Sequence, residues 1–250
     1  MLKIILVGAS GAMGRTLVEI CKDNNTYQIV GGVAEKSTDE FCFPVYDKLD
    51  KIMAKADVLI DFSNRSMLAS ISEYASLYKI PVVFATTGFT EDDYKKIDEL
   101  SKLVPIMQEG NYSLGINVMV ELSKKLALAL EDFDIEIVES HHNLKKDNPS
   151  GTANMIFEAV NEARGKKLNK VMRNFSHDDS RHKNDVGISS VRAGTIVGEH
   201  RLILAGVDEV IEVKHMAGSK KIFAIGALKA AKFLKDKIPG RYSFKEVIND

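Results

Sequence analysis

Two adjacent histidines and a lysine stand in one short polar segment, residues 139–153, with the sequence ESHHNLKKDNPSGTA. His141 and His142 follow a predicted strand, and because successive strand side chains point to opposite faces, they are suited to two separate roles. An imidazole can donate a proton near neutral pH, and Lys145 supplies a fixed positive charge. These residue types at this spacing indicate proton transfer to an anionic substrate.

The end of the same segment, residues 149–152, predicts the start of a helix. Backbone N–H groups at a helix N-terminus, together with the hydroxyls of Ser150 and Thr152, would form a pocket for a carboxylate. The alternative is that these hydroxyls act only as N-caps of the helix. No cysteine or further histidine stands at a metal-ligand spacing nearby in the sequence, so we expect no metal site.

A second candidate site lies at the N-terminus, where Gly8, Gly11 and Gly14 separate a predicted strand from a predicted helix. The spacing is a variant of the dinucleotide-binding fingerprint. Gly8 permits a tight turn, Gly11 lets the backbone approach a pyrophosphate, and Gly14 lets the helix pack close to the strand. The helix N-terminus would then face the phosphates. A glycine turn without a ligand is the alternative.

The end of the second predicted strand carries the pair Glu35-Lys36. An acidic residue about 20 positions after the glycine turn binds the ribose hydroxyls of NAD, whereas Lys36 could contact a 2′-phosphate. We therefore expect NADH as the preferred cofactor, with NADPH also possible; an exposed ion pair is the alternative. Further cofactor contacts are expected at the ends of the third and fourth strands, from Phe62, Thr86, Thr87 and Gly88.

The elements that position these residues alternate between strand and helix through the first 112 residues. Continuous apolar runs indicate strands that are buried on both faces of a parallel sheet, so we predict an α/β, Rossmann-like domain. Its predicted strands are 2–8, 28–34, 57–62, 80–85 and 105–108, and its predicted helices are 13–21, 67–78 and 91–103, the last with Thr90 as its N-cap.

The pattern changes after residue 112, and we predict an α+β domain over 113–218 with a mixed, largely open sheet. An Ala-rich helix from Ser219 to Lys235 begins the C-terminal segment, and we expect this C-terminal helix, 219–250, to complete the first domain. The charged stretch 166–185 is predicted to be an exposed or mobile loop. The predicted helices are 116–130 and 152–164, and the predicted strands are 134–140, 187–191, 196–205 and 209–215.

Composition narrows the classes of function. The chain has 34 basic and 35 acidic residues, a formal net charge of −1, so nothing in its overall charge favours nucleic acid or an anionic membrane as a partner. The apolar run within the first ten residues is too short to span a bilayer and lacks the organisation of a signal peptide. The two cysteines, Cys21 and Cys42, are expected to be small buried residues in a reducing compartment. We therefore expect a cytoplasmic protein.

The segment 139–153 resembles the E-x-H-H-x-x-K-x-D-x-P-S-G-T-A signature of the 4-hydroxy-tetrahydrodipicolinate reductases, also called dihydrodipicolinate reductases. The resemblance extends over nearly the whole chain. It includes GASGAMG at 8–14, ATTGF at 85–89, NYS at 111–113, VRAG at 191–194 and VGEH at 197–200. The histidine–lysine signature is highly specific, whereas the glycine turn alone is not.

The resemblance implies NAD(P)H-dependent reduction of 4-hydroxy-tetrahydrodipicolinate, a small dicarboxylate of the diaminopimelate route to lysine, by a homotetramer. It implies His141 as the acid/base and Lys145 as its partner. The implied substrate contacts are His142, Lys145, Ser150, Gly151 and Thr152. The implied cofactor contacts are Gly8, Ser10, Gly11, Ala12, Met13, Glu35, Lys36, Ala85, Gly88, Glu109, Gly110, Asn111, Tyr112 and Lys220.

Two departures from the family pattern concern the cofactor. Many members have Arg at the positions of Ala12 and Lys220, and both differences weaken the case for a strong NADPH preference. Two other functions stay open from the residues alone. One is a dehydrogenase of an amino acid such as aspartate or homoserine, which would share the nucleotide half; the other is an NAD(P)-binding regulator without catalysis.

Overall fold

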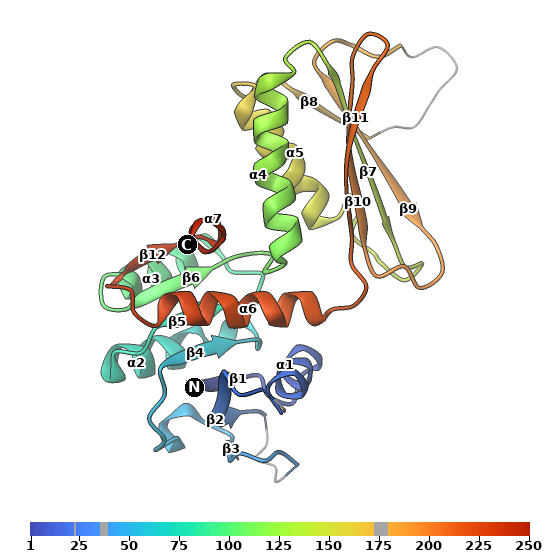
Figure 1. The fold of residues 1–250 in the computed structure, drawn as a ribbon. Coiled ribbons are helices and arrows are strands. Elements are labelled where there is room, and N and C mark those ends of the chain that lie inside the picture. Colours follow the sequence, from blue (N-terminus) through green and yellow to red (C-terminus); the bar gives the residue numbers. More distant parts are fainter. Residues whose placement is uncertain (23, 36–39, 173–179) are drawn as a thin grey trace. The chain divides into compact units, whose positions relative to one another are not determined.

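The computed structural model describes residues 1–22, 24–35, 40–172 and 180–250, and the chain divides into two compact units. The first unit joins Met1–Leu114 to Lys220–Asp250, and the second is Gly115–Ser219. Figure 1 shows the elements of both units in sequence colours. Among the described residues, no helix is long and apolar enough to cross a membrane.

The first unit is built on a seven-stranded sheet in which every neighbouring pair is parallel. Parallel neighbours need crossover connections, and helices supply several of them, for example α1 between β1 and β2 and α3 between β5 and β6. The strand order is β12-β6-β5-β4-β1-β2-β3. The bounds are β1 Leu2–Val7, β2 Tyr27–Val33, β3 Val45–Tyr46, β4 Val58–Asp61, β5 Val82–Phe84, β6 Pro105–Gln108 and β12 Gly240–Tyr242.

Helices cover both faces of this sheet. Strand β1 shows why its apolar run is unbroken: Ile4 and Leu6 join one buried cluster, while Ile5 and Val7 join the other. The first cluster includes residues of α1, Ala12–Lys22, and α6, Lys221–Leu234; the second includes residues of α2, Leu68–Tyr78, and α3, Glu91–Ser101. Thr90 caps α3 as predicted. The short helices η1, Leu49–Lys51, and η2, Arg65–Met67, complete the connections.

The Ala-rich helix predicted from Ser219 to Lys235 is confirmed as α6, but it does not extend over the whole segment 219–250. Helix α6 ends at Leu234, β12 then pairs with β6 at the edge of the sheet, and α7 follows at Phe244–Asn249. Pro239 and Gly240 interrupt the helical pattern between them. The Rossmann-like fold class is confirmed, and the short edge strands β3 and β12 were not predicted.

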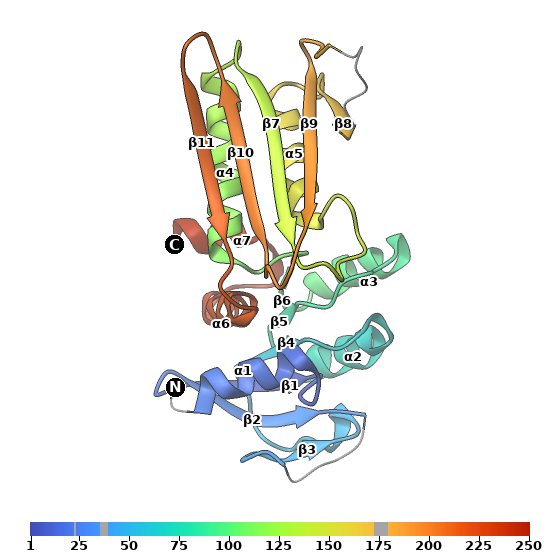
Figure 2. The same cartoon turned by 90° about the vertical axis from the view of Figure 1, so that its right-hand side faces the viewer.

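The second unit is a five-stranded mixed sheet, as predicted, in the order β11-β10-β7-β9-β8. Strands β7, β9 and β8 are parallel to one another, whereas β10 and β11 pair antiparallel. Helices α4, Leu114–Ala129, and α5, Gly151–Ala163, lie on one face (Figure 2). The strand bounds are β7 Asp134–His141, β8 Asn169–Met172, β9 Asp185–Arg192, β10 Glu199–Ala205 and β11 Val210–Met216.

Three local predictions were wrong. The charged stretch 166–185 was predicted to be a loop, but it contains the strand β8. This strand is held by backbone pairing to β9, and its mostly exposed side chains show no apolar alternation. Residues 173–179 of that stretch lie outside the described residues. The strand predicted from 196 begins only at Glu199. Cys42 is exposed because it lies in an irregular segment before β3, whereas Cys21 is buried in α1.

Candidate active site

The glycine turn of the first unit has the close contacts that its sequence predicted. Gly8 has a φ of +84°, and a Cβ there would lie 2.6 Å from the Phe62 carbonyl oxygen. A Cβ on Gly14 would lie 2.1 Å from the Gly8 carbonyl oxygen. Both approaches exclude a side chain, so the turn and the first residues of α1, Ala12 and Met13, depend on glycine.

A cavity of about 280 Å³ adjoins this turn. It brings together five of the predicted cofactor residues, which are Gly8, Ser10, Gly11, Glu35 and Phe62. A glycine-rich wall at a helix N-terminus suits phosphates, and a carboxylate at the end of β2 suits ribose hydroxyls. The residues present therefore fit a nicotinamide dinucleotide. Lys36 lies outside the described residues.

The remaining predicted cofactor residues differ in what their side chains do. Ala85, Thr86, Thr87 and Gly88 directly follow β5, and Gly88 has a φ of +81°. The Glu109 carboxylate accepts a hydrogen bond from the Phe244 N–H at 2.9 Å. Burial raises the pKa of Glu109, and this bond and nearby Arg241 oppose the rise.

Two neighbours of Glu109 are also tied into the first unit. The Tyr112 hydroxyl donates to the Phe84 carbonyl oxygen at 3.0 Å, and Asn111 Oδ1 accepts from the Ser113 N–H at 2.8 Å. The Cβ position of Gly110 is open, with no heavy atom within 4 Å. Lys220 is exposed and immediately precedes α6. The structure thus uses the Glu109 and Tyr112 side chains as internal ties.

In the second unit, polar residues of three neighbouring strands meet on one rung of the sheet. Glu139 of β7 pairs with Ser190 of β9 on one side and with His200 of β10 on the other. Along the same face, Ile137 and Leu202 are fully buried. The sheet face that α5 covers is therefore apolar at Ile137 and Leu202. It becomes polar one rung further on, at Glu139 and His200, beside the start of α5.

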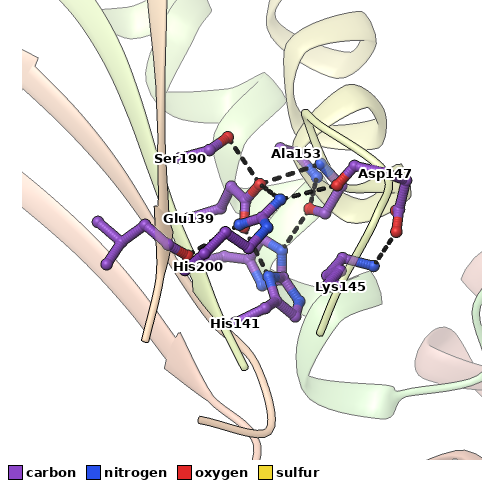
Figure 3. A network of polar contacts seen from close by, with 10 residues as sticks. Glu139, His141, Lys145, Asp147, Ala153, Ser190 and His200 are labelled. Carbon is purple, nitrogen blue, oxygen red and sulfur yellow. Dashed lines mark hydrogen bonds and ion pairs between the residues drawn. The ribbon is translucent and has the colours of Figure 1, made fainter. Parts of the chain in front are cut away.

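The Glu139 carboxylate is the centre of a hydrogen-bond network (Figure 3). Its Oε1 accepts from Arg192 Nη2 at 2.7 Å, from Ser190 Oγ at 2.7 Å and from the Ser150 N–H at 3.2 Å. Its Oε2 accepts from Arg192 Nη1 at 2.8 Å and lies 2.5 Å from His141 Nδ1. Burial alone would raise the pKa of Glu139, but the bonds from Arg192, Ser190 and His141 hold it at about 2.

Ser150 joins this network to the start of α5. Its Oγ accepts from the Ala153 N–H at 3.1 Å, so it is the N-cap, and the same oxygen lies 2.9 Å from His200 Nε2. Burial first, and the nearby charge of His141 second, lower the pKa of His200 to about 4. His200 is therefore neutral near pH 7. Gly151 and Thr152 form the first turn of α5.

The other predicted residues lie along the loop between β7 and α5. Lys145 Nζ pairs with Asp147 Oδ1 at 2.7 Å, and this hydrogen bond lowers the pKa of Asp147. His141, the last residue of β7, is buried, whereas His142, which follows the strand, is partly exposed, so the two rings have different surroundings. Reasoning from the sequence assigned no role to Glu139 or Arg192. The missed signal is their placement at inward-facing strand positions.

The first unit is Rossmann-like and has a dinucleotide-type glycine turn. The second unit holds buried imidazoles beside a helix N-terminus. Together these features define a nicotinamide-nucleotide-dependent oxidoreductase. Two family models match: dihydrodipicolinate reductase, N-terminus, over residues 2–112, and dihydrodipicolinate reductase, C-terminus, over residues 115–248. The chain belongs to the dihydrodipicolinate reductase family.

Individual relatives agree with this membership. The chain is 46% identical over 248 residues to the 4-hydroxy-tetrahydrodipicolinate reductase of Caldanaerobacter subterraneus subsp. tengcongensis, covering 99% of this chain and 98% of the relative. It is 42% identical to that of Clostridium tetani, covering 100% and 98%. A dipicolinate-bound dihydrodipicolinate reductase from Paenisporosarcina sp. TG-14 shares the fold, with a TM-score of 0.83, 19% identity and 97% of each chain covered. The family membership decides against the amino-acid dehydrogenase alternative.

Proposed function

We propose that this chain reduces 4-hydroxy-tetrahydrodipicolinate to tetrahydrodipicolinate in the diaminopimelate route to lysine. The observation that carries the proposal is the His141–Glu139 contact of 2.5 Å beside the N-cap Ser150, in a chain of this reductase family. It combines a group able to supply a proton with a helix N-terminus able to hold a carboxylate. The bound nicotinamide nucleotide would supply the hydride.

The residues of the second unit have distinct proposed roles in this reaction. His141, in its imidazolium form, supplies from Nε2 the proton that balances the added hydride and keeps its Nδ1–H towards Glu139. The first turn of α5, with Ser150, Gly151 and Thr152, holds one substrate carboxylate, and Lys145 and His142 contribute charge and hydrogen bonds to it. Lys145 is held at 2.7 Å by Asp147, so its ammonium is already oriented within this loop.

For the cofactor, we propose that NADH is preferred and NADPH is tolerated. Glu35 lines the cavity beside the glycine turn, where its carboxylate would accept from ribose hydroxyls and repel a 2′-phosphate. Ala12, at the start of α1, offers no cation to that phosphate. A comparison of kcat/KM for the two nucleotides tests this choice, and a higher value with NADPH would contradict it.

We also propose that the chain forms a homotetramer in the cytoplasm. The second unit exposes apolar side chains on its sheet strands, with Val191 44%, Val210 64% and Met216 68% exposed. Apolar groups of this kind are a usual component of subunit interfaces. Light scattering coupled to gel filtration would measure the mass of the assembly, and a monomer at micromolar concentration would refute this part of the proposal.

The assay of the main proposal follows NADH oxidation with freshly made 4-hydroxy-tetrahydrodipicolinate. His141→Ala and Lys145→Gln are expected to lower kcat about 10²-fold or more while NADH binding stays unchanged, because both side chains lie in the second unit. Lys146→Gln is the matched control, since Lys146 is the exposed neighbouring lysine of the same loop. NADH binding without oxidation by the wild-type chain would instead favour a regulator, and full turnover in both variants would remove the assigned roles.

A further inference from the structure

The Glu139 side chain is completely buried on β7, and its partners include His141 and the N-cap Ser150, both of which have a role in the proposed function. Arg192 of β9 binds both carboxylate oxygens with its two terminal nitrogens, at 2.7 and 2.8 Å. Ser190 of the same strand adds a third donor at 2.7 Å. A bidentate Arg–carboxylate pair has a fixed geometry, so the position of this carboxylate is closely defined.

The first group that the Glu139 carboxylate orients is His141. An ionised carboxylate can only accept hydrogen bonds, so the hydrogen in the 2.5 Å contact belongs to His141 Nδ1. The nitrogen that remains to exchange a proton is therefore Nε2. A Cβ on Gly198 would lie 3.1 Å from that Nε2, so this glycine leaves the space that the ring occupies.

The second group that the same carboxylate orients is the start of α5. Its Oε1 accepts from the Ser150 N–H at 3.2 Å, and Ser150 is the N-cap of the helix. Arg192 Nη2 also donates to the Asp147 carbonyl oxygen at 2.7 Å, three residues earlier in the loop. The Glu139–Arg192 ion pair thus contacts both ends of the loop that separates His141 from the helix.

We propose that Glu139, paired with Arg192, is a positioning residue: it fixes His141 as the Nδ1–H tautomer and sets the spacing between that ring and the start of α5. This inference rests on the proposed function, because that function assigns proton donation to His141 and carboxylate binding to the helix start. Because the Glu139 carboxylate positions both His141 and the start of α5, we expect its loss to lower kcat and also to weaken substrate binding.

The decisive variant is Glu139→Gln, which keeps the size of the side chain. Its amide oxygen replaces only one carboxylate oxygen, and the side with three donors, Arg192, Ser190 and the Ser150 N–H, is the favourable place for it. The amide NH₂ group then faces His141 Nδ1, which must become an acceptor. The hydrogen of the neutral imidazole consequently moves to Nε2.

Glu136→Gln is the matched control. Glu136 lies on the same strand and forms an ion pair with Arg181, but it is placed on the opposite side of β7 from Glu139 by strand alternation and does not contact His141. Both variants remove one carboxylate from an arginine pair of β7, but Glu136 is 32% exposed whereas Glu139 is fully buried. The control therefore reports the effect of losing such a pair, and the tautomer of His141 separates a positioning role of Glu139 from a purely structural one.

Two measurements test the inference. Long-range ¹H–¹⁵N NMR of the histidine rings reports the tautomer: we expect Nδ1–H at His141 in the wild type and in Glu136→Gln, and Nε2–H in Glu139→Gln. Steady-state kinetics with 4-hydroxy-tetrahydrodipicolinate and NADH should show kcat reduced about 10²-fold in Glu139→Gln, with a higher KM for the substrate and an unchanged Kd for NADH. Glu136→Gln should keep wild-type kinetics.

The outcomes separate the inference from the proposed function. If the wild-type chain does not reduce the substrate, the function fails, while the tautomer measurement still decides whether Glu139 orients His141. If Glu139→Gln does not fold, two other results decide: the tautomer of His141 in the wild type and the kinetics of Arg192→Lys. The lysine keeps the positive charge but cannot bind both carboxylate oxygens as the planar guanidinium does. Nε2–H in the wild type, or wild-type kcat in Glu139→Gln or Arg192→Lys, would overturn the inference.

Discussion

His200 supports a prediction about stability and pH. Its side chain is 4% exposed, and burial, followed by the nearby charge of His141, lowers its pKa from 6.5 to about 4. Between these two pH values the unfolded chain binds a proton that the folded chain does not bind. The contribution of His200 to stability is therefore complete above about pH 6.5 and is lost as the pH falls towards about 4.

The size of this loss follows from the same two values. The interval from 6.5 to about 4 corresponds to roughly 3 kcal/mol, at about 1.4 kcal/mol for each pH unit. About 2 kcal/mol of it is lost on going from about pH 7 to about pH 5. Glu139 does not interfere, because its pKa falls from 4.5 to about 2 on folding, and its contribution is lost only below about pH 4.5.

The assay is urea unfolding at about pH 7 and about pH 5, with His200→Gln as the test variant. The Nε2 of Gln can donate to Ser150 Oγ, as the imidazole Nε2 can, but Gln does not titrate. His182→Gln is the control, because His182 is exposed in the same unit. Between about pH 7 and about pH 5, the free energy of unfolding of the wild type and of the control should fall by about 2 kcal/mol more than that of His200→Gln. An equal loss in all three proteins would refute the reasoning.

Three further predictions follow from the two sites. Gly14→Ala should destabilise the first unit by about 3 kcal/mol and abolish NADH binding, measured by thermal unfolding and nucleotide fluorescence, because its Cβ would lie 2.1 Å from the Gly8 carbonyl oxygen. Glu35→Ala should move the NADH/NADPH ratio of kcat/KM about tenfold towards NADPH; an unchanged ratio would show that Glu35 does not read the ribose. Asp147→Asn should raise the substrate KM a few-fold by releasing Lys145 from its 2.7 Å contact, and a constant KM would contradict that.

The first unit was largely predictable from the sequence because its strands are buried on both faces. An unbroken run such as Ile4 to Val7 has few other structures open to it, and Gly8 and Gly14 mark a turn with known geometry. The short strand β12 was missed because it is three residues long and is held at a sheet edge mainly by backbone pairing to β6. Such pairing leaves no periodic signal in the side chains.

The active-site loop was predictable in its residue types but not in its supporting contacts. His141, Lys145 and the N-cap Ser150 are close in sequence, so their local geometry follows from a strand, a loop and a helix start. Arg192 and His200 are far from them in sequence, and only the register of β9 and β10 against β7 brings them to Glu139. Register of this kind is set by tertiary pairing, which a single sequence does not display.

The cost of the Glu139–Arg192 pair is itself an argument for its role. Glu139 is fully buried and Arg192 is 20% exposed. The cost of removing such charges from water is offset only by good mutual geometry, and apolar residues of similar volume are often at least as stabilising at buried positions. The neighbouring rung, with Ile137 and Leu202, shows that this face of the sheet accepts such apolar packing. A sheet optimised for stability alone would continue that packing to the strand ends. The ion pair stands instead where the same carboxylate contacts His141 and the start of α5, so its contribution is the fixed geometry of those two groups.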